Sequence, residues 1–194
     1  NKEIPEWGRT LTDAELQSEM MADFFVGGSE TPTNAIAAGM RELIEKPALW
    51  EQLKSDPEKY LPTFCEEIIR IEGPVQGLLR ELSEDVEMHG VHMPAGSIVN
   101  LRFAAANRDE REYDNAGEVD LDRERSRTHL AFGFGEHFCL GAPLARREMY
   151  WSFKVLIDRV ENMRFAEGKI DFVFYPNYFL RALKELHIEF EKKA

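Results

Sequence analysis

Apolar side chains recur three or four positions apart over most of residues 12–45, which predicts one long helix. Thr12 opens the sequence signature of a capping box at the start of this helix. The pattern is interrupted over residues 27–32 (Gly-Gly-Ser-Glu-Thr-Pro), where Pro32 has no N–H to donate to the carbonyl of Gly28. We therefore expect the helix to open or kink at this point.

Further helices and a smaller set of strands follow along the chain. Helical spacing predicts helices at Pro47–Ser55, Pro57–Ile71 and Leu144–Val160. Alternation and turn signals predict strands at Val75–Leu82, Val86–Met88, Val91–Met93 and Ser97–Leu101, and short strands over Ile170–Phe190. Residues 108–128 are rich in charge and lack periodicity, so we expect an irregular but ordered loop there. Together these elements predict an α+β fold that is mainly helical.

The composition suits a folded protein, because 43% of the 194 residues are hydrophobic. A net charge of −12 argues against nucleic acid as a partner. No apolar run approaches the length of a membrane span and no signal peptide opens the sequence, so we expect no membrane partner. The two cysteines, Cys65 and Cys139, fit a reducing cytoplasm. Because the chain begins with Asn1 and in the middle of a pattern, we expect a piece of a longer protein.

One stretch, Phe132 to Gly141, combines glycines, aromatic rings and a cysteine directly before a predicted helix. Its glycines let the backbone turn tightly and approach a flat object closely. Cys139 stands at the N-terminus of that helix, where backbone N–H groups and the helix dipole favour a thiolate. Such a thiolate suits an axial metal ligand, and the Phe132 ring can pack against a porphyrin. The alternative is a buried structural cysteine in a glycine-rich loop.

The pattern Phe132-x-x-Gly135-x-x-x-Cys139-x-Gly141 resembles the haem-binding loop of the cytochrome P450 family, the haem-thiolate monooxygenases. The resemblance, to the soluble bacterial type, implies heme b (iron protoporphyrin IX) with Cys139 as its axial thiolate ligand. It also implies that Phe132, Gly133 and Gly141 are cofactor-binding residues.

The sequence Glu67-x-x-Arg70 places a carboxylate and a guanidinium one helical turn apart. Taken alone, such a pair is usually an ordinary surface ion pair. Its position before the cysteine loop resembles the Glu-x-x-Arg signature of the same family, which implies a structural triad with an arginine from the irregular segment. Arg123 is the matching position. Because the segment that follows it is one residue longer than expected, Arg125 or Arg127 are alternatives.

Glu30 and Thr31 resemble the acid–alcohol pair of the family's oxygen-binding groove. The resemblance implies that Glu30 relays protons from solvent and that Thr31 holds dioxygen and its waters. The alternative is a helix kink with two incidental polar residues. Pro32 departs from the family's pattern, which more often has Thr or Val there.

The two propionates of a haem need cationic or hydrogen-bonding partners. By resemblance, His137, two residues before Cys139, and Arg80, ten residues after Arg70, are such partners. His129 is a further candidate, and its alternative role is that of a structural histidine.

Taken together, the resemblance implies that residues 1–194 are the C-terminal, haem-binding portion of a single cytochrome P450 domain whose N-terminal half is absent. The parent protein would insert one oxygen atom from dioxygen into a small apolar organic substrate. A ferredoxin or similar electron donor would dock at the cysteine-side face, drawn by arginines. One alternative is a truncated and inactive haem-binding fragment, and another is a haem-thiolate enzyme of the peroxide-using or isomerase type.

Overall fold

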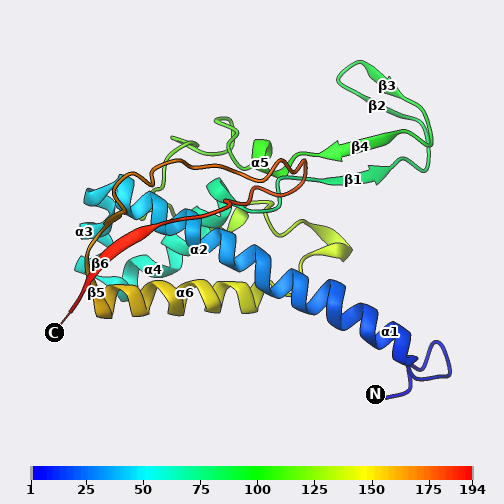
Figure 1. The fold of residues 1–194 in the computed structure, drawn as a ribbon. Coiled ribbons are helices and arrows are strands. Elements are labelled where there is room, and N and C mark those ends of the chain that lie inside the picture. Colours follow the sequence, from blue (N-terminus) through cyan, green and yellow to red (C-terminus); the bar gives the residue numbers. More distant parts are fainter. Residues whose placement is uncertain (1, 194) are drawn as a thin grey trace.

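The computed structural model describes residues 2–193. A long helical rod forms the N-terminal part and projects beyond the rest of the molecule (Figure 1). It consists of α1 (Asp13–Ser18), the π-helix η1 (Glu19–Val26) and α2 (Gly27–Glu45). The predicted capping box is present, because the Thr12 hydroxyl accepts from the Glu15 N–H at 3.3 Å and the Thr12 N–H donates to Glu15 Oε2 at 2.8 Å.

Of the two forms expected at Pro32, the opening of the helix is not found, and the kink stays a prediction. The backbone stays α-helical from Gly27 to Glu45, with Pro32 inside the helix. The departure from α-helical geometry is the π-helix η1, which ends directly before Gly27. Side chains supply hydrogen-bond donors around the proline: the Thr31 and Thr33 hydroxyls donate to the carbonyls four residues before them, at 2.8 and 2.7 Å. The two hydroxyls bond the carbonyls on either side of Gly28, whose own carbonyl is the one that loses a backbone donor to Pro32.

Three helices enclose the hydrophobic core. α2 packs against α4 (Pro57–Glu72) and α6 (Ala142–Arg159), while α3 (Pro47–Ser55) covers the end of α4. The rings of Phe64 and Phe153 meet edge to face at the centre, with centroids 4.9 Å apart. The bounds predicted for α3 match, and those predicted for α4 and α6 differ from the observed ones by at most two residues.

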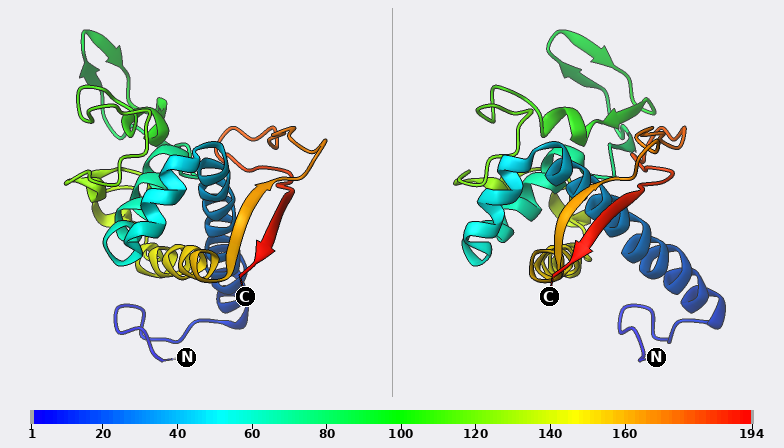
Figure 2. Two further views of the ribbon diagram at one scale, coloured as in Figure 1. Left: turned by 90° about the vertical axis from the view of Figure 1, so that its left-hand side faces the viewer. Right: turned by 60° about the vertical axis from the view of Figure 1, so that its left-hand side comes forward.

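The strands form three small antiparallel pairs rather than one sheet. β1 (Leu78–Glu81) pairs with β4 (Ile98–Leu101), and β2 (Val86–Met88) pairs with β3 (Val91–Met93) in a hairpin that extends from one end of the molecule (Figure 1). β5 (Val160–Phe165) and β6 (Ile188–Lys192) form a ribbon beside α2 (Figure 2). The sequence pattern did not predict β5. Of the predicted tail strands, only β6 is extended over several residues, and Phe174 and Leu180 form isolated bridges.

Between β4 and α6 the described chain has only short helical turns: α5 (Phe103–Ala106), η2 (Ser126–Thr128) and η3 (Gly135–His137). This segment is nevertheless anchored, because Tyr113, Ala116 and Leu121 are buried. An irregular segment that is held by buried side chains agrees with the expectation for residues 108–128. Overall, the fold is α+β and mainly helical, as predicted.

Large apolar side chains remain exposed on several elements. Every residue of η1 is exposed, including Met21, Phe24 and Phe25. The β1–β4 pair adds Leu79 and Ile98. Contiguous apolar surface of this kind usually marks a face that another element covers. Within residues 2–193, no helix combines the length and the apolar character that a membrane span needs.

Candidate haem-binding site

The cysteine loop, residues 132–141, closes on itself through backbone hydrogen bonds. The Cys139 N–H donates to the Phe132 carbonyl at 2.9 Å, and the Gly133 N–H donates to the Leu130 carbonyl at 2.9 Å. Gly133 and Gly135 have φ angles of +74° and +79°, a region that residues with a side chain rarely adopt. Gly133 and Gly135 are therefore required by the turn that presents Cys139.

The sulfur of Cys139 is accessible and lies beside the first turn of α6. The residue is exposed, and a β-carbon added at Gly141 would lie 3.7 Å from Cys139 Sγ, so the backbone passes close to the sulfur. Phe134 and Leu140 of the same loop are 87% and 96% exposed. The loop therefore offers one sulfur within an apolar surface, which suits a flat apolar macrocycle with a metal at its centre.

Cys65, the other cysteine, is in the opposite situation. It is buried in α4, where burial, aided by the neighbouring Glu66 carboxylate, raises the pKa of its thiol to about 12. A neutral, enclosed thiol cannot present a thiolate to a ligand. Of the two cysteines, only Cys139 has the exposure that a metal ligand needs.

Glu67 and Arg70 form a fully buried, two-pronged ion pair on α4. Arg70 donates from Nε and Nη2 to the two Glu67 oxygens at 2.8 and 2.9 Å. Its Nη1 also donates to the carbonyls of Asn107 and Ala116, at 2.8 and 2.7 Å. These bonds fasten the irregular segment, which has no regular secondary structure to hold it, to the core helix.

Arg123 is the arginine that joins this pair. Its Nε lies 3.0 Å from Glu67 Oε1, and the Asp120 N–H donates to Glu67 Oε2 at 3.0 Å. Burial alone would raise the pKa of Glu67, but the hydrogen bonds from Arg70 and Asp120, the charge of Arg70 and the nearby Arg123 guanidinium outweigh it and lower that pKa below its ordinary value. Arg127, one of the two alternatives, lies against Glu66 instead, at 3.2 Å.

The neighbouring carboxylate, Glu66, holds a second cluster that the sequence interpretation missed. It is 2% exposed and binds His129 Nε2 at 3.0 Å and Arg146 Nε at 2.6 Å. Burial would raise the pKa of Glu66, but the hydrogen bonds from His129 and Arg146 and the charge of Arg146 lower it. Two adjacent glutamates on a helix carry no local signal of burial, because their partners are distant in sequence.

The position of His129 does not suit the expected contact with a haem propionate. Its side chain is buried, its Nε2 meets Glu66, and its Nδ1 accepts from the Ala131 N–H at 3.3 Å. Both ring nitrogens therefore have protein partners. The structure favours the alternative role, that of a structural histidine.

The other two candidate propionate partners are exposed. His137 lies in η3, and Arg80 lies on β1 with Nη1 donating to the Leu79 carbonyl at 2.7 Å. Phe132 is half-buried and is covered by the Arg146 guanidinium, 4.8 Å from the ring centre. An exposed thiol, an apolar loop, a guanidinium and an imidazole are the kinds of groups that a haem with two carboxylates needs.

Glu30 and Thr31 lie on α2, the helix that packs against α6. Glu30 is exposed, and its backbone carbonyl accepts from the Asn34 side chain at 2.8 Å. Thr31 is half-buried, and its hydroxyl donates to the Gly27 carbonyl at 2.8 Å. The acid is thus open to solvent, while the alcohol is engaged by its own helix.

Residues 1–162 match the family model described as Cytochrome P450, and the chain belongs to the cytochrome P450 family. Members of this family are haem-thiolate oxidoreductases. The chain is 33% identical to a steroid C26-monooxygenase of Mycobacterium tuberculosis over 183 residues, 94% of this chain and 48% of that protein. It is 36% identical to the cytochrome P450 monooxygenase PikC of Streptomyces venezuelae, over 96% of this chain and 44% of that protein.

Solved structures agree with this assignment. Substrate-free CYP150A6 of Mycobacterium marinum superposes with a TM-score of 0.92 at 31% identity, covering 100% of this chain and 48% of that one. CYP109E1 of Bacillus megaterium in complex with corticosterone gives a TM-score of 0.85 at 36% identity, over 96% and 49% of the two chains. The chain thus spans about half the length of the relatives it matches.

Proposed function

We propose that this chain is the haem-binding, C-terminal portion of a soluble bacterial-type cytochrome P450 monooxygenase, with Cys139 as the axial thiolate ligand. The observation that carries the proposal is the contrast between the two cysteines. Cys139 is exposed in a glycine-turned loop at the start of α6, whereas Cys65 is enclosed in the core. A thiolate-ligated heme b supplies the activation of dioxygen from which one oxygen atom enters the substrate.

The residues of the chain would support that chemistry from two sides. Glu67, Arg70 and Arg123 form a structural triad that fixes the segment leading to the cysteine loop. His137 and Arg80 would pair with the propionates. The exposure of both side chains supports this assignment.

On α2, the exposed carboxylate of Glu30 would take protons from solvent and pass them inward. The Thr31 hydroxyl, which donates to the Gly27 carbonyl, would turn to hold a water in the groove. An acid can serve such a relay only within one water of the acceptor, so this role needs both residues on the face of α2 that the haem approaches.

The substrate class and the electron donor belong to the same proposal. The exposed apolar side chains of η1 support the proposal that the substrate is a small apolar organic molecule. They also support the proposal that further protein covers that face. A ferredoxin-type donor would dock beside the cysteine loop, where Arg127 and Arg147 are exposed. Arg123 and Arg146 contribute less to such a patch, because their side chains are only 9% and 24% exposed, against 72% for Arg127. We place the protein in the cytoplasm.

The test compares Cys139→Ala with Cys65→Ala in the full-length protein. We expect Cys139→Ala to lose the carbon monoxide difference spectrum that is characteristic of a thiolate ligand. Cys65→Ala removes a similar sulfur without touching the loop and should keep that spectrum. An unchanged spectrum in Cys139→Ala overturns the ligand assignment.

A second candidate is a peroxide-using or isomerase-type haem-thiolate enzyme. The continuous α2 helix favours this second candidate. The Thr31 hydroxyl donates to the Gly27 carbonyl, so it does not point a free donor into an oxygen-binding groove. Turnover that peroxide supports and that reduced ferredoxin never supports would select this alternative. Turnover with reduced ferredoxin and dioxygen would select the monooxygenase.

The exposed face of η1 favours a further possibility, that these 194 residues alone are an inactive fragment. Expression of the chain alone with haem, followed by an absorption spectrum, distinguishes the cases. A fragment that requires the other half of the domain should show weak or ill-defined haem absorption. That absorption should recover when the remaining part of the domain is supplied.

A further inference from the structure

Glu66 occupies a point on α4 from which it reaches both ends of the cysteine loop. His129 precedes the loop and Arg146 follows it, yet both bind the same buried carboxylate, at 3.0 and 2.6 Å. The exposed Arg127 adds a third contact at 3.2 Å. One side chain therefore joins three positions that lie between 61 and 80 residues further along the chain.

On the N-terminal side of the loop, called the near side below, the contact of Glu66 with His129 continues into the loop through hydrogen bonds. The Ala131 N–H donates to His129 Nδ1 at 3.3 Å, so Nδ1 is an acceptor and the ring proton is on Nε2, which donates to Glu66. The next residue, Phe132, accepts from the Cys139 N–H at 2.9 Å through its carbonyl. An unbroken series of bonds thus leads from Glu66 to the backbone of Cys139.

On the C-terminal side of the loop, Arg146 fixes the start of α6. Its Nε and Nη2 donate to the two Glu66 oxygens at 2.6 and 3.2 Å, a two-pronged geometry that sets the orientation of the guanidinium. The same guanidinium lies 4.8 Å from the centre of the Phe132 ring. Because α6 begins at Ala142, directly after the loop, this contact fixes the other flank of Cys139.

We infer that Glu66 is a positioning residue for the cysteine loop: its carboxylate braces both flanks of the loop and so holds Cys139 where the sulfur can ligate haem. Its neighbour Glu67 has a different task, because its partners are Arg70 of α4 itself and Asp120 and Arg123 of the segment upstream of the loop. Glu66 touches neither the sulfur nor the loop backbone, so it acts through His129 and Arg146.

The inference rests on the proposed function, because it assumes that the loop binds haem through Cys139. The test uses the full-length haem-loaded protein with Glu66→Gln, which keeps the shape of the side chain and removes its charge. Glu72→Gln is the matched control. Glu72 is also buried on α4 and paired with arginines, Arg108 and Arg181 at 2.8 Å each, but neither arginine belongs to the loop or to α6.

Two properties are measured in each variant: the urea midpoint of unfolding, and the rate at which the thiolate-type carbon monoxide spectrum decays. We expect the spectrum of Glu66→Gln to decay about tenfold faster than that of Glu72→Gln when the two are compared at equal distance from their midpoints, since hydrogen bonds to a buried charge are worth about that factor. A purely structural role would shift both midpoints and leave the two decay rates equal.

A milder variant, His129→Phe, keeps a ring at position 129 and leaves the ion pair between Glu66 and Arg146 intact. It cuts only the near-side branch, so it tests the inference even if Glu66→Gln fails to fold. We expect faster decay than in the wild type here as well. Decay in His129→Phe at the wild-type rate, or in Glu66→Gln at the rate of Glu72→Gln, overturns the inference. Absence of the thiolate-type spectrum in the wild type would instead refute the proposed function itself.

Discussion

Phe153 of α6 fills the space beside Gly39 of α2. A β-carbon added at Gly39 would lie 2.5 Å from Cζ of the Phe153 ring, closer than real contacts allow. The glycine therefore sets how closely the helix that carries Glu30 and Thr31 approaches the helix that follows Cys139. Phe153 cannot withdraw easily, because it is fully buried and packs on Phe64.

The first prediction follows from this contact. Gly39→Ala should lower the free energy of unfolding by about 1–2 kcal/mol, because overpacking costs more than the helix gains from losing a glycine. Gly28→Ala in the same helix is the control. Nothing lies within 4 Å of a β-carbon at Gly28, so that variant should be neutral or more stable. Urea unfolding measures both, and a Gly39→Ala protein as stable as Gly28→Ala would contradict the packing argument.

The second prediction concerns the triad. Glu67→Gln should destabilise the protein by about 3–5 kcal/mol, because it leaves the buried guanidinium of Arg70 without its counter-charge. The exposed pair between Lys154 and Asp158 is the comparison, and Lys154→Gln should have little effect because water already screens that pair. Urea unfolding again supplies the measurement. Comparable losses in the two variants would show that burial is not what makes the triad strong.

The third prediction is a loss of stability in acid. The pKa of Glu66 is lowered in the folded protein, so its contribution is fully present above the unfolded-chain value of 4.5. It is lost as the pH falls from there through the lower folded-state pKa, because protonation breaks the contacts to His129 and Arg146. The free energy of unfolding of the wild type should therefore fall below pH 4.5, and that of Glu66→Gln should fall less steeply. Parallel curves would exclude this carboxylate as a source of the acid sensitivity.

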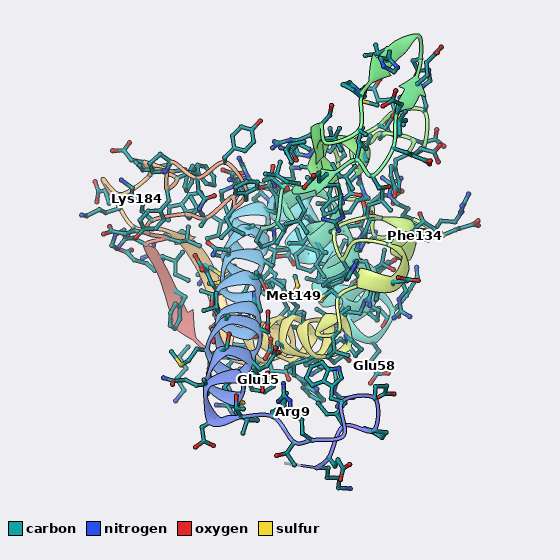
Figure 3. All side chains as sticks on the ribbon, turned by 90° about the vertical axis from the view of Figure 1, so that its right-hand side faces the viewer. Arg9, Glu15, Glu58, Phe134, Met149 and Lys184 are labelled. Carbon is teal, nitrogen blue, oxygen red and sulfur yellow. The ribbon has the colours of Figure 1, made fainter. Side chains whose placement is uncertain are left out.

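The fourth prediction tests the electron-donor face. Arg147→Glu should raise the KM for reduced ferredoxin roughly tenfold and weaken its dependence on salt, because a charge that attracts an acidic partner becomes repulsive. Lys184→Glu is the control, since Lys184 lies on the side of the molecule opposite Phe134 of the cysteine loop (Figure 3). Figure 3 also shows Arg9 and Glu15, whose exposed ion pair lies at the N-terminal end of the molecule. An equal effect of both reversals would indicate a response to net charge rather than docking at this face.

Much of the fold could be predicted from local sequence. The helices α3, α4 and α6 and the β2–β3 hairpin were predictable because periodicity, prolines and turn glycines act within a few residues. β5 was missed because its three apolar residues, Val160, Met163 and Phe165, are irregularly spaced, and only its pairing with β6, far along the chain, makes it a strand. The opening expected at Pro32 was mispredicted because Pro32 is buried and α2 packs against α4 and α6, and a local rule for proline does not include such contacts.

The features of the site also divide into those that local sequence predicts and those that tertiary contacts decide. The sequence by itself predicted the cysteine loop and the pair of Glu67 and Arg70 through their resemblance to the cytochrome P450 signatures, which consist of required residue types at fixed short spacings. Tertiary structure decided between Arg123, the position that the resemblance indicated, and Arg127, and it showed that His129 meets Glu66, which favours a structural histidine over a propionate partner. The physical reason is that a buried charge needs a partner, and which partner is near depends on how segments more than 50 residues apart pack together.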